Sequence, residues 1–493
     1  MALFVRIVPL LFFSFAALAG ETVSRPGTLH LTLESAVRMA LAKNFTIEVQ
    51  RFEPQIARAG VTTELGRFDP VFDLSATRSE TTRSDVFNQG RHTGISDVTR
   101  TDRIGGGLSG LTPWGLRYDA GLGTGNLTGS FNRFDEDFTS NASLGLTQPL
   151  LRGFGTDTNL AQLRIARNNV LVSEWQLRKQ IIDTITTTNF VYNELHLAHE
   201  NLGVAEGFRD LALQLLADNT RRAEIGVMSP LNITTARAEA ASRQEGVILA
   251  VRQVKDNENL IKQLVTTDME RMLSISVEIE PPPSPAFHAN VPAGIGEALT
   301  LRPDYRQAIL DLERRNIRLA FTKNQALPRF DLTGSLNLLG FDNDIGTSVN
   351  RVARRDATEW TAGAIFSVPL PNHEGRGNVL AAQLATAQAM VNLQRLEQQI
   401  VVDVDNASGQ IVTGRERIAS TSEARKLAKE SLDAGEDRLR AGTGTTFEVL
   451  ELQKKLAEAE FAELRARADY NKAVGEYQRQ TGTTLRIYHV VIE

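Results

Sequence analysis

The chain has 493 residues, and its 54 Lys and Arg against 59 Asp and Glu give a net charge of −5, which excludes the basic footprint of a nucleic-acid-binding protein. It has no cysteine, which excludes a disulfide scaffold, a thiol nucleophile, a cysteine zinc site and a lipoprotein anchor. Residues 1–19 predict a secretory signal peptide, because Arg6 precedes an apolar run that ends in Ala17-Leu18-Ala19. No later stretch approaches the ~18 uninterrupted apolar residues of a transmembrane helix. We therefore expect an exported protein without one.

The mature sequence repeats one order of landmarks in two halves. Residues 70–74 (PVFDL) return as residues 328–332 (PRFDL), and Arg222-x-x-x-Gly226 returns as Arg438-x-x-x-Gly442. Such repetition predicts an architecture built by symmetry, in which each half runs helix, strand, loop, strand, long helix, turn, helix. The expected domains are a first repeat over residues 20–277, a proline-rich linker over 278–292 and a second repeat over 293–493.

Short segments within residues 70–149 and 328–369 alternate strictly between apolar and polar residues, as Phe72, Leu74 and Ala76 show. This alternation predicts half-buried strands, and ~10 residues is the length with which a tilted strand crosses a bilayer. Four strands cannot close a barrel without leaving backbone groups unpaired in lipid. Pooling strands across subunits solves this problem, and three subunits with about four strands each would make a twelve-stranded barrel. A soluble β-sandwich would show the same alternation.

The polar stretches 79–103 and 341–358 predict loops between these strands. Residues 104–111 and 116–122 also alternate, and they flank the turn signal Thr112-Pro113-Trp114-Gly115. Because the second half has no equivalent, we interpret residues 104–123 as an accessory hairpin outside the membrane. The alternative is a pair of further barrel strands.

Four prolines stand where predicted helices meet predicted strands. Proline fits such joints because it lacks an N–H and cannot continue a helical ladder. Helical sequence then runs from residue 155 to 222 and from 378 to 440, and roughly 68 residues at ~1.5 Å each make a helix on the order of 100 Å long. Small residues on several helix faces favour a tube wall with neighbours on both sides over a coiled-coil rod. The expected helix–barrel joints are Pro70, Pro149, Pro328 and Pro369.

Three segments carry a family resemblance: Leu33-x-x-Ala36-x-x-x-Ala40-Leu41-x-x-Asn44, Gln148-Pro149-Leu150 and residues 442–450 (GTGTTFEVL). With their order and duplication, the chain resembles the TolC-like outer-membrane efflux protein family over nearly the whole mature sequence. The resemblance implies an α+β membrane protein: a homotrimer with a β-barrel in the outer membrane of a Gram-negative bacterium and a helical barrel that extends into the periplasm. It implies a passive exit duct of a tripartite efflux pump or a type I secretion system. The implied partners are a periplasmic adaptor protein, an inner-membrane pump or ABC transporter, and outer-membrane lipid.

The resemblance also implies where the duct closes. Family members close their pore and meet the adaptor at the periplasmic tip, and Glu448 and Glu451 fall at positions that resemble the family's acidic constriction ring. Three copies of each carboxylate on one axis would repel one another and attract cations; the alternative is two solvated helix-face glutamates. Arg222 and Arg438 would bind helix-end carbonyls or contact the adaptor. The expected tip and adaptor-contact residues are Arg222, Gly226, Ser229, Pro230, Arg438, Gly442, Thr443 and Gly444.

Catalytic and cofactor motifs are weak or missing from the sequence. His196-x-x-His199-Glu200 lacks a third metal ligand, and Gly105-Gly106-Gly107 precedes a strand where a phosphate cradle would precede a helix. Asp342-Asn343-Asp344 lacks the glycine and distal glutamate of a calcium loop. We therefore expect no enzyme, no cofactor and no metal site. The alternative function is a periplasmic trimeric helical scaffold that does not insert in the membrane.

Overall fold

The computed structural model describes residues 27–84, 96–226, 229–283 and 286–491; the predicted signal peptide lies outside these ranges. The chain divides into two compact units, and each takes segments from both halves of the sequence. Unit 1 comprises residues 1–45, 183–289 and 407–479, and unit 2 comprises residues 46–182, 290–406 and 480–493. None of the described helices is long and apolar enough to span a bilayer.

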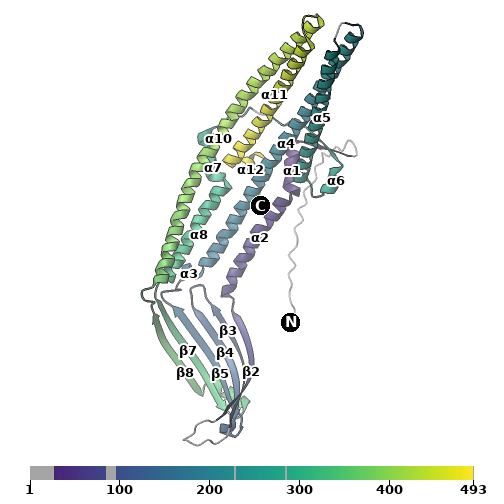
Figure 1. Ribbon diagram of the computed structural model, residues 1–493. Coiled ribbons are helices and arrows are strands. Elements are labelled where there is room, and N and C mark those ends of the chain that lie inside the picture. The colour runs from purple at the N-terminus through teal and green to yellow at the C-terminus, as the bar shows by residue number, and fades with distance from the viewer. Residues whose placement is uncertain (1–26, 85–95, 227–228, 284–285, 492–493) are drawn as a thin grey trace. The chain divides into compact units, whose positions relative to one another are not determined.

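Unit 2 contains one antiparallel sheet of six strands, in the order β2-β3-β4-β5-β7-β8 (Figure 1). Each strand pairs along nearly its whole length with the next, from Val71↔Ser109 at one edge to Arg329↔Ser367 near the other. The strands are β2 (Val71–Ser84), β3 (Ser96–Leu111), β4 (Arg117–Gly129), β5 (Asp137–Pro149), β7 (Arg329–Asp342) and β8 (Ala357–Ser367).

The register of the sheet sorts its side chains onto two different faces. On what we call the apolar face, two neighbouring rows cross all six strands: Phe72, Leu108, Ala120, Leu144, Leu336 and Trp360, then Leu74, Gly106, Leu122, Ala142, Leu338 and Thr358. On what we call the polar face, one row holds Asp73, Gly107, Gly121, Ser143, Asn337 and Glu359. Successive residues of a strand point to opposite faces, so the period-two pattern of the sequence becomes this division.

The interpretation of residues 104–123 as an accessory hairpin is wrong. These residues belong to β3 and β4, which lie between β2 and β5 in the same sheet, so the sheet has six strands where the sequence predicted four. The predicted loops are also mostly regular structure. Residues 79–84 and 96–103 extend β2 and β3, and residues 345–354 form helix α9.

The helices of unit 2 lie side by side in the order α2, α4, α8, α10 (Figure 1), and a polar contact joins each adjacent pair. Arg58 of α2 pairs with Glu174 of α4 at 2.9 Å, Arg314 of α8 donates to Asn169 of α4, and Tyr305 of α8 donates to Glu397 of α10. Both α4 and α10 continue into unit 1. The helices are α2 (Phe45–Leu65), α3 (Thr156–Asn159), α4 (Ala161–Glu224), α7 (Val291–Leu301), α8 (Pro303–Gln325), α9 (Ile345–Arg354), α10 (His373–Arg440) and α12 (Thr484–Ile487).

Unit 1 is helical, with one small parallel sheet that the sequence did not predict. β1 (Thr28–Leu31) pairs with β6 (Ser276–Ile279), and the buried Tyr192 hydroxyl donates to the Leu31 and Glu280 carbonyls at 3.0 and 2.7 Å. Burial raises the pKa of Tyr192 to about 12, so the phenol remains a donor. The predicted linker thus begins within β6 and ends within α7. The helices wholly assigned to this unit are α1 (Leu33–Lys43), α5 (Pro230–Val265) and α6 (Met269–Leu273), and most of α11 (Thr446–Thr481) joins them.

Candidate functional site

Two helix–turn–helix segments of unit 1 carry the predicted tip residues. In the first, α4 ends at Glu224 and α5 begins at Pro230, whose predecessor Ser229 accepts a hydrogen bond from the Leu231 N–H. In the second, α10 ends at Arg440 and α11 begins at Thr446. Ser229 is a favoured N-cap and proline suits the first helical turn, so the sequence itself starts α5 at this position.

Each turn reverses the chain at a glycine in the left-handed region. Gly226 has φ +79° and Gly442 has φ +78°, a conformation that glycine adopts without the strain of a Cβ. In the second turn the Arg438 carbonyl accepts from both the Thr443 and Gly444 N–H groups, at 2.9 and 3.0 Å. A Cβ at Gly444 would lie 3.0 Å from the Leu439 nitrogen, so this position has little room for a side chain.

The two predicted arginines both bind backbone carbonyls, Arg222 at the end of α10 and Arg438 in the turn that follows it. Arg222 donates to the carbonyl of Leu439 at 3.3 Å, which ties the first hairpin to the second, and Arg438 donates to the Thr443 carbonyl of its own turn at 3.5 Å. Carbonyls at a helix C-terminus lack intrahelical donors and carry partial negative charge, so a guanidinium suits them. Of the two roles considered for these arginines, helix-end carbonyl binding is present for Arg222, and adaptor contact stays a prediction for both.

Glu448 and Glu451 lie in the first turns of α11, three residues apart and so on neighbouring parts of one helix surface. Arg438 pairs with Glu448 at 2.6 Å, and Thr445 accepts a hydrogen bond from the Glu448 N–H at 3.2 Å. Glu451 has no ion-pair partner among the residues that the structure describes. The two glutamates therefore differ in local charge balance, a difference that their spacing in the sequence did not reveal.

Beneath these turns a compact apolar cluster holds the two hairpins together. Phe208 and Leu215 of α4 pack with Leu432 of α10 and with the α11 residues Val449, Leu450, Leu456 and Ala457, all buried. A buried leucine or phenylalanine contributes about 1.5–3 kcal/mol relative to exposure. The position of the tip residues therefore rests mainly on this packing.

The predicted joint prolines all lie in unit 2 at ends of strands. Pro70 and Pro328 each precede the first residue of a strand, Pro149 is the last residue of β5, and Pro369 follows β8 by two positions. Polar side chains close these joints: Asn159 donates to the carbonyls of Gly153 and Gly155 at 2.8 and 2.9 Å. Asn324 also takes part, since it accepts from the Gly153 N–H at 2.8 Å. These asparagines were not singled out in the sequence, although Asn is a frequent partner of irregular backbone.

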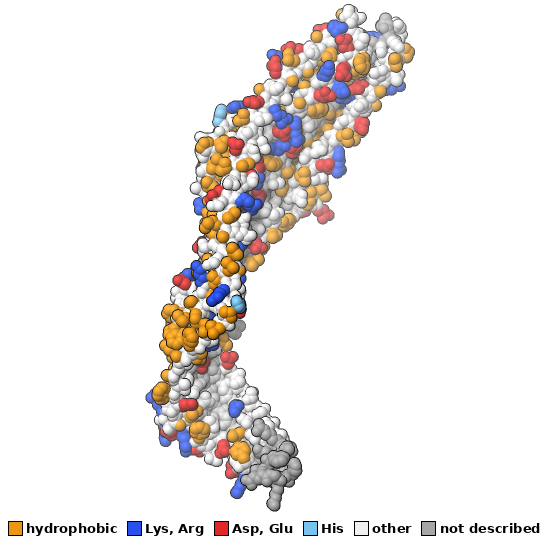
Figure 2. Space-filling view, turned by 60° about the vertical axis from the view of Figure 1, so that its left-hand side comes forward, with side chains coloured by type: hydrophobic (Ala, Val, Ile, Leu, Met, Phe, Trp, Pro, Cys, Tyr) orange, Lys and Arg blue, Asp and Glu red, His pale blue; other side chains and the backbone are white. Residues whose placement is uncertain are grey.

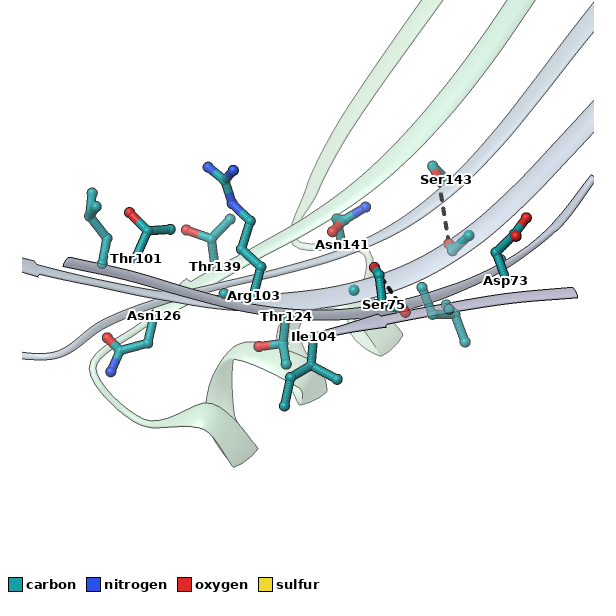
Figure 3. Close-up of a pocket in the computed structure, with 18 residues that line it drawn as sticks. Asp73, Ser75, Thr101, Arg103, Ile104, Thr124, Asn126, Thr139, Asn141 and Ser143 are labelled. Carbon is teal, nitrogen blue, oxygen red and sulfur yellow. Dashed lines mark hydrogen bonds between the residues drawn. The ribbon is translucent and has the colours of Figure 1, made fainter. Parts of the chain in front are cut away.

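The polar face of the sheet contains a hollow, shown in Figure 3. Its walls carry Asp73, Ser75 and Arg103, and its floor is backbone because glycines occupy the centre of β3 and β4. Gly105 and Gly107, considered above as a phosphate cradle, lie in this sheet, where a Cβ would stand 3.3 and 3.2 Å from carbonyl oxygens of β4. The glycines thus leave a smooth polar surface with no side chains across its middle.

Except at Ser140 and Gly340, which α9 contacts, the apolar face has no cover among the described residues. Phe72 is 71% exposed, Leu74 75%, Leu122 69% and Trp360 73%. In Figure 2, exposed hydrophobic side chains also lie along the helices above the sheet. Burying apolar surface is the main driving force of folding, and large exposed apolar patches mark contact with another protein or with a membrane. This face therefore requires a partner.

Among the residues that the structure describes, no group of three potential metal ligands comes together. Burial lowers the pKa of His196, while nearby Glu200 opposes this effect. α9 is the main element that the sequence analysis missed. Its signal was present: Asp344 accepts from the Thr347 N–H as an N-cap, and Ile345, Val349 and Val352 follow at helical spacing.

Comparisons with known proteins test the family resemblance that the sequence predicted. The model of the outer membrane efflux protein family matches residues 294–482. The outer membrane efflux protein BepC of Brucella suis is 23% identical over 357 residues, which cover 70% of this chain and 74% of that protein. The resemblance that the sequence predicted is therefore confirmed.

Two solved structures share the fold. The CmeC outer membrane channel of Campylobacter jejuni superimposes with a TM-score of 0.69 at 18% identity, over 91% of this chain and 85% of that one. The MtrE outer membrane channel of Neisseria gonorrhoeae gives a TM-score of 0.63 at 17% identity, over 91% and 88% of the two chains. At these identities the superpositions establish the α+β fold.

Proposed function

From the match of residues 294–482 to the outer membrane efflux protein family, we propose that the chain is a passive exit duct of a tripartite efflux pump or type I secretion system, gated at its helical tip. The resemblance assigns the chain to the outer membrane of a Gram-negative bacterium, with a part that extends into the periplasm, and to transport proteins that are not enzymes. The homotrimer, the barrel, the gate and the partners form the finer part of this proposal.

The observation that carries the proposal is the two-faced sheet of unit 2. Its apolar face suits lipid and its polar face suits a water-filled lumen, the division found in transmembrane barrels. The edge strands β2 and β8 run antiparallel to one another, because the sheet has an even number of strands. β8 of one copy therefore meets β2 of the next as an antiparallel neighbour, and a ring of copies leaves no unpaired edge in lipid.

Three copies of the six-stranded sheet contribute eighteen strands, against the twelve expected from the sequence. Barrel diameter grows roughly linearly with strand number, and barrels of about 16–18 strands leave an aqueous channel. A variant that lacks residues 79–137, with Arg78 joined to Phe138 through an Asn-Gly turn, is expected to have four strands per subunit. The join is possible because Arg78 and Phe138 lie in the same row of the sheet. The diameter of the barrel is then expected to fall to about two thirds of that of the native protein. The measurement is the size of the largest polymer that enters the pore and lowers its conductance, with the polymer added on the side of the β7–β8 connection.

The helix layer of unit 2 supports a ring of copies in the same way. α2 and α10 lie at its two edges, and both expose apolar residues at helical spacing. Val49, Phe52 and Ile56 of α2 and Leu380, Leu384 and Val391 of α10 are each more than half exposed. A copy that presents its α2 edge to the α10 edge of the next buries both stripes, and such head-to-tail contacts close into a ring.

We assign the gate to Glu448 and Glu451 from the resemblance, and the Arg438–Glu448 ion pair gives the two carboxylates different surroundings. Arg438 offsets the charge of Glu448, so Glu451 carries more of the net negative charge of each copy. Rings of carboxylates select cations, because the negative potential concentrates them at the constriction. We therefore expect Glu451→Gln to reduce cation selectivity more than Glu448→Gln.

The test is single-channel conductance of the full-length protein in planar lipid bilayers. Cation-selective currents that lose selectivity in Glu448→Gln/Glu451→Gln, with the double variant Glu245→Gln/Glu270→Gln outside the turns as an equal-charge control, support duct and gate. Unchanged selectivity in the double variant refutes the gate residues and leaves the duct. A folded trimer that forms no pores refutes the duct and favours the alternative, a periplasmic scaffold that does not insert.

A further inference from the structure

α9, in the connection between β7 and β8, packs on the apolar face of the sheet in unit 2. Its Ser348 is buried, and the hydroxyls of Ser348 and Ser140 are 2.6 Å apart. A Cβ on Gly340 would overlap the Ser348 carbonyl oxygen, so only glycine on β7 allows the helix so close. Arg351 of α9 adds an ion pair to Asp342 at 2.6 Å. These contacts fix the position and rotation of the helix.

This position is a boundary on the apolar face. Ser140 and Gly340 belong to the row after the two apolar rows. The next row is the first with charged residues, and it holds Arg78, Asp102, Asn126, Phe138 and Asp342. In that charged row Arg78 lies 3.6 Å from Asp102, and one row further Arg100 and Glu80 pair at 2.9 Å across β3 and β2. The helix therefore lies where the apolar surface ends and charged surface begins.

The exposed side of α9 is itself amphipathic. Ile345 and Val349 are 46% and 49% exposed, and Val352 continues their stripe. The sheet receives Ser348 and Arg351 instead, so the apolar stripe has no cover within the described chain. Asn350 and Arg354 lie around the helix from that stripe, and Arg355 follows at the C-cap. Neither Arg354 nor Arg355 has an ion-pair partner among the described residues.

We propose that α9 is a membrane-surface anchor that lies in the headgroup layer of the outer leaflet. Its Ile345–Val349–Val352 stripe contacts acyl chains, and Arg354 and Arg355 contact anionic, phosphate-bearing headgroups. The inference rests on the proposed barrel, because the strand ends opposite the long helices then face outward.

Two features of the chain identify lipid as the occupant. The stripe continues the apolar face that the proposed barrel presents to the membrane, and the adjacent arginines complement anionic headgroups. Helices with one apolar and one basic side lie in membrane interfaces in this way, and each arginine near an anionic surface strengthens binding.

The absence of cysteine from the sequence makes a direct test practical, because one introduced cysteine is the only labelling site. Val349→Cys, Asn350→Cys and Leu122→Cys variants of the full-length protein carry an environment-sensitive fluorophore and are reconstituted in phosphatidylcholine vesicles with or without phosphatidylglycerol. Lipids brominated on their acyl chains quench labels that lie among those chains. Asn350 is the matched control, one residue from Val349 on another side of α9, and Leu122 reports on the barrel itself.

The anchor predicts strong quenching at positions 349 and 122 and weak quenching at 350. Arg354→Gln/Arg355→Gln in the Val349→Cys background is expected to lower the ratio of lipid-contacting to water-exposed label at position 349 by about fivefold per arginine in vesicles containing phosphatidylglycerol. Quenching at 122 with none at 349, or equal quenching at 349 and 350, overturns the anchor while the barrel stands. An unquenched label at 122 instead refutes the barrel on which the anchor depends.

Discussion

The sheet of unit 2 exposes its apolar side chains, whereas the helices below the turns of unit 1 bury theirs. In the sheet, Phe72 and Leu74 are more than two thirds exposed and the strands are held by backbone pairing. In α11, directly after the second turn, Val449 and Leu456 are buried against neighbouring helices. One region therefore needs a surrounding medium or partner to bury its apolar side chains, while the other already buries them within the chain.

A charge introduced on the apolar face is the strongest test of this difference between the two regions. Ala142→Arg places a guanidinium in the row between Leu122 and Leu338 and is expected to destabilise the inserted barrel by about 2–4 kcal/mol per copy. Asn141→Arg, one residue away on the polar face, is expected to be tolerated. Heat-modifiable gel mobility after reconstitution measures both. Equal tolerance of the two substitutions would contradict the assignment of the faces.

The corresponding change in the turns removes buried carbon. Leu456→Ala is expected to cost about 3 kcal/mol, because its site lies in the apolar cluster below the turns and collapses only in part. Lys455→Ala, its exposed neighbour on α11, is expected to stay within about 0.5 kcal/mol of the native protein. Urea unfolding in detergent, followed by circular dichroism, gives both values. A small effect of Leu456→Ala would show that packing does not hold the turns.

Acid is expected to weaken unit 1 through Glu463. Burial tends to raise the pKa of Glu463, but hydrogen bonds from Arg467 and Arg425 outweigh burial and hold that pKa below its ordinary value. A depressed pKa in the folded state adds stability above the unfolded value of 4.5, and this stability is lost as pH falls through the folded value. We expect Glu463→Gln to cost about 1–2 kcal/mol at neutral pH.

The measurement for Glu463 is urea unfolding of both proteins across the acid range. The difference between native protein and Glu463→Gln should shrink as pH falls below 4.5, where the native carboxylate becomes protonated. A difference that is the same at neutral and acid pH would rule out the ion pairs as its source.

The smallest expected effect concerns the turn glycines. Gly226→Ala introduces a Cβ at φ +79° and is expected to destabilise unit 1 by about 1 kcal/mol. Gly246→Ala, in the interior of α5 with open space around its Cα, is expected to stabilise by about 0.5–1 kcal/mol. Opposite signs in urea unfolding support the left-handed turn, and equal signs would contradict it.

Much of the fold could be predicted from the sequence because its signals are local. The alternation of Phe72 and Leu74 with Asp73 and Ser75 predicted both faces of β2, and the long proline-free stretches predicted α4 and α10. The six-strand sheet could not be predicted in this way. Alternation within β3 and β4 shows that they are strands, but their pairing partners depend on contacts outside them. The ends of β2 and β3 were missed because charged pairs such as Arg100–Glu80 replace the apolar pattern there.

In the candidate site, too, local features could be predicted and contacts between distant residues could not. The turn glycines, Ser229 and Pro230 were predictable because each acts on its own backbone. The Arg438–Glu448 pair was not, because it forms only after the chain reverses between the two residues. The constriction ring of Glu448 and Glu451 stays a prediction, since it depends on several copies meeting at one axis.

The parallel pairing of β1 with β6 imposes an order on the folding of the protein as it is exported. Thr28 pairs with Ser276, and the Tyr192 hydroxyl donates to the carbonyls of Leu31, the last residue of β1, and Glu280, which follows β6. A chain delivered from its N-terminus exposes β1 long before β6 exists. Residues 28–31 therefore wait unpaired until residue 279 has emerged, and closing so long a loop is a slow step of folding.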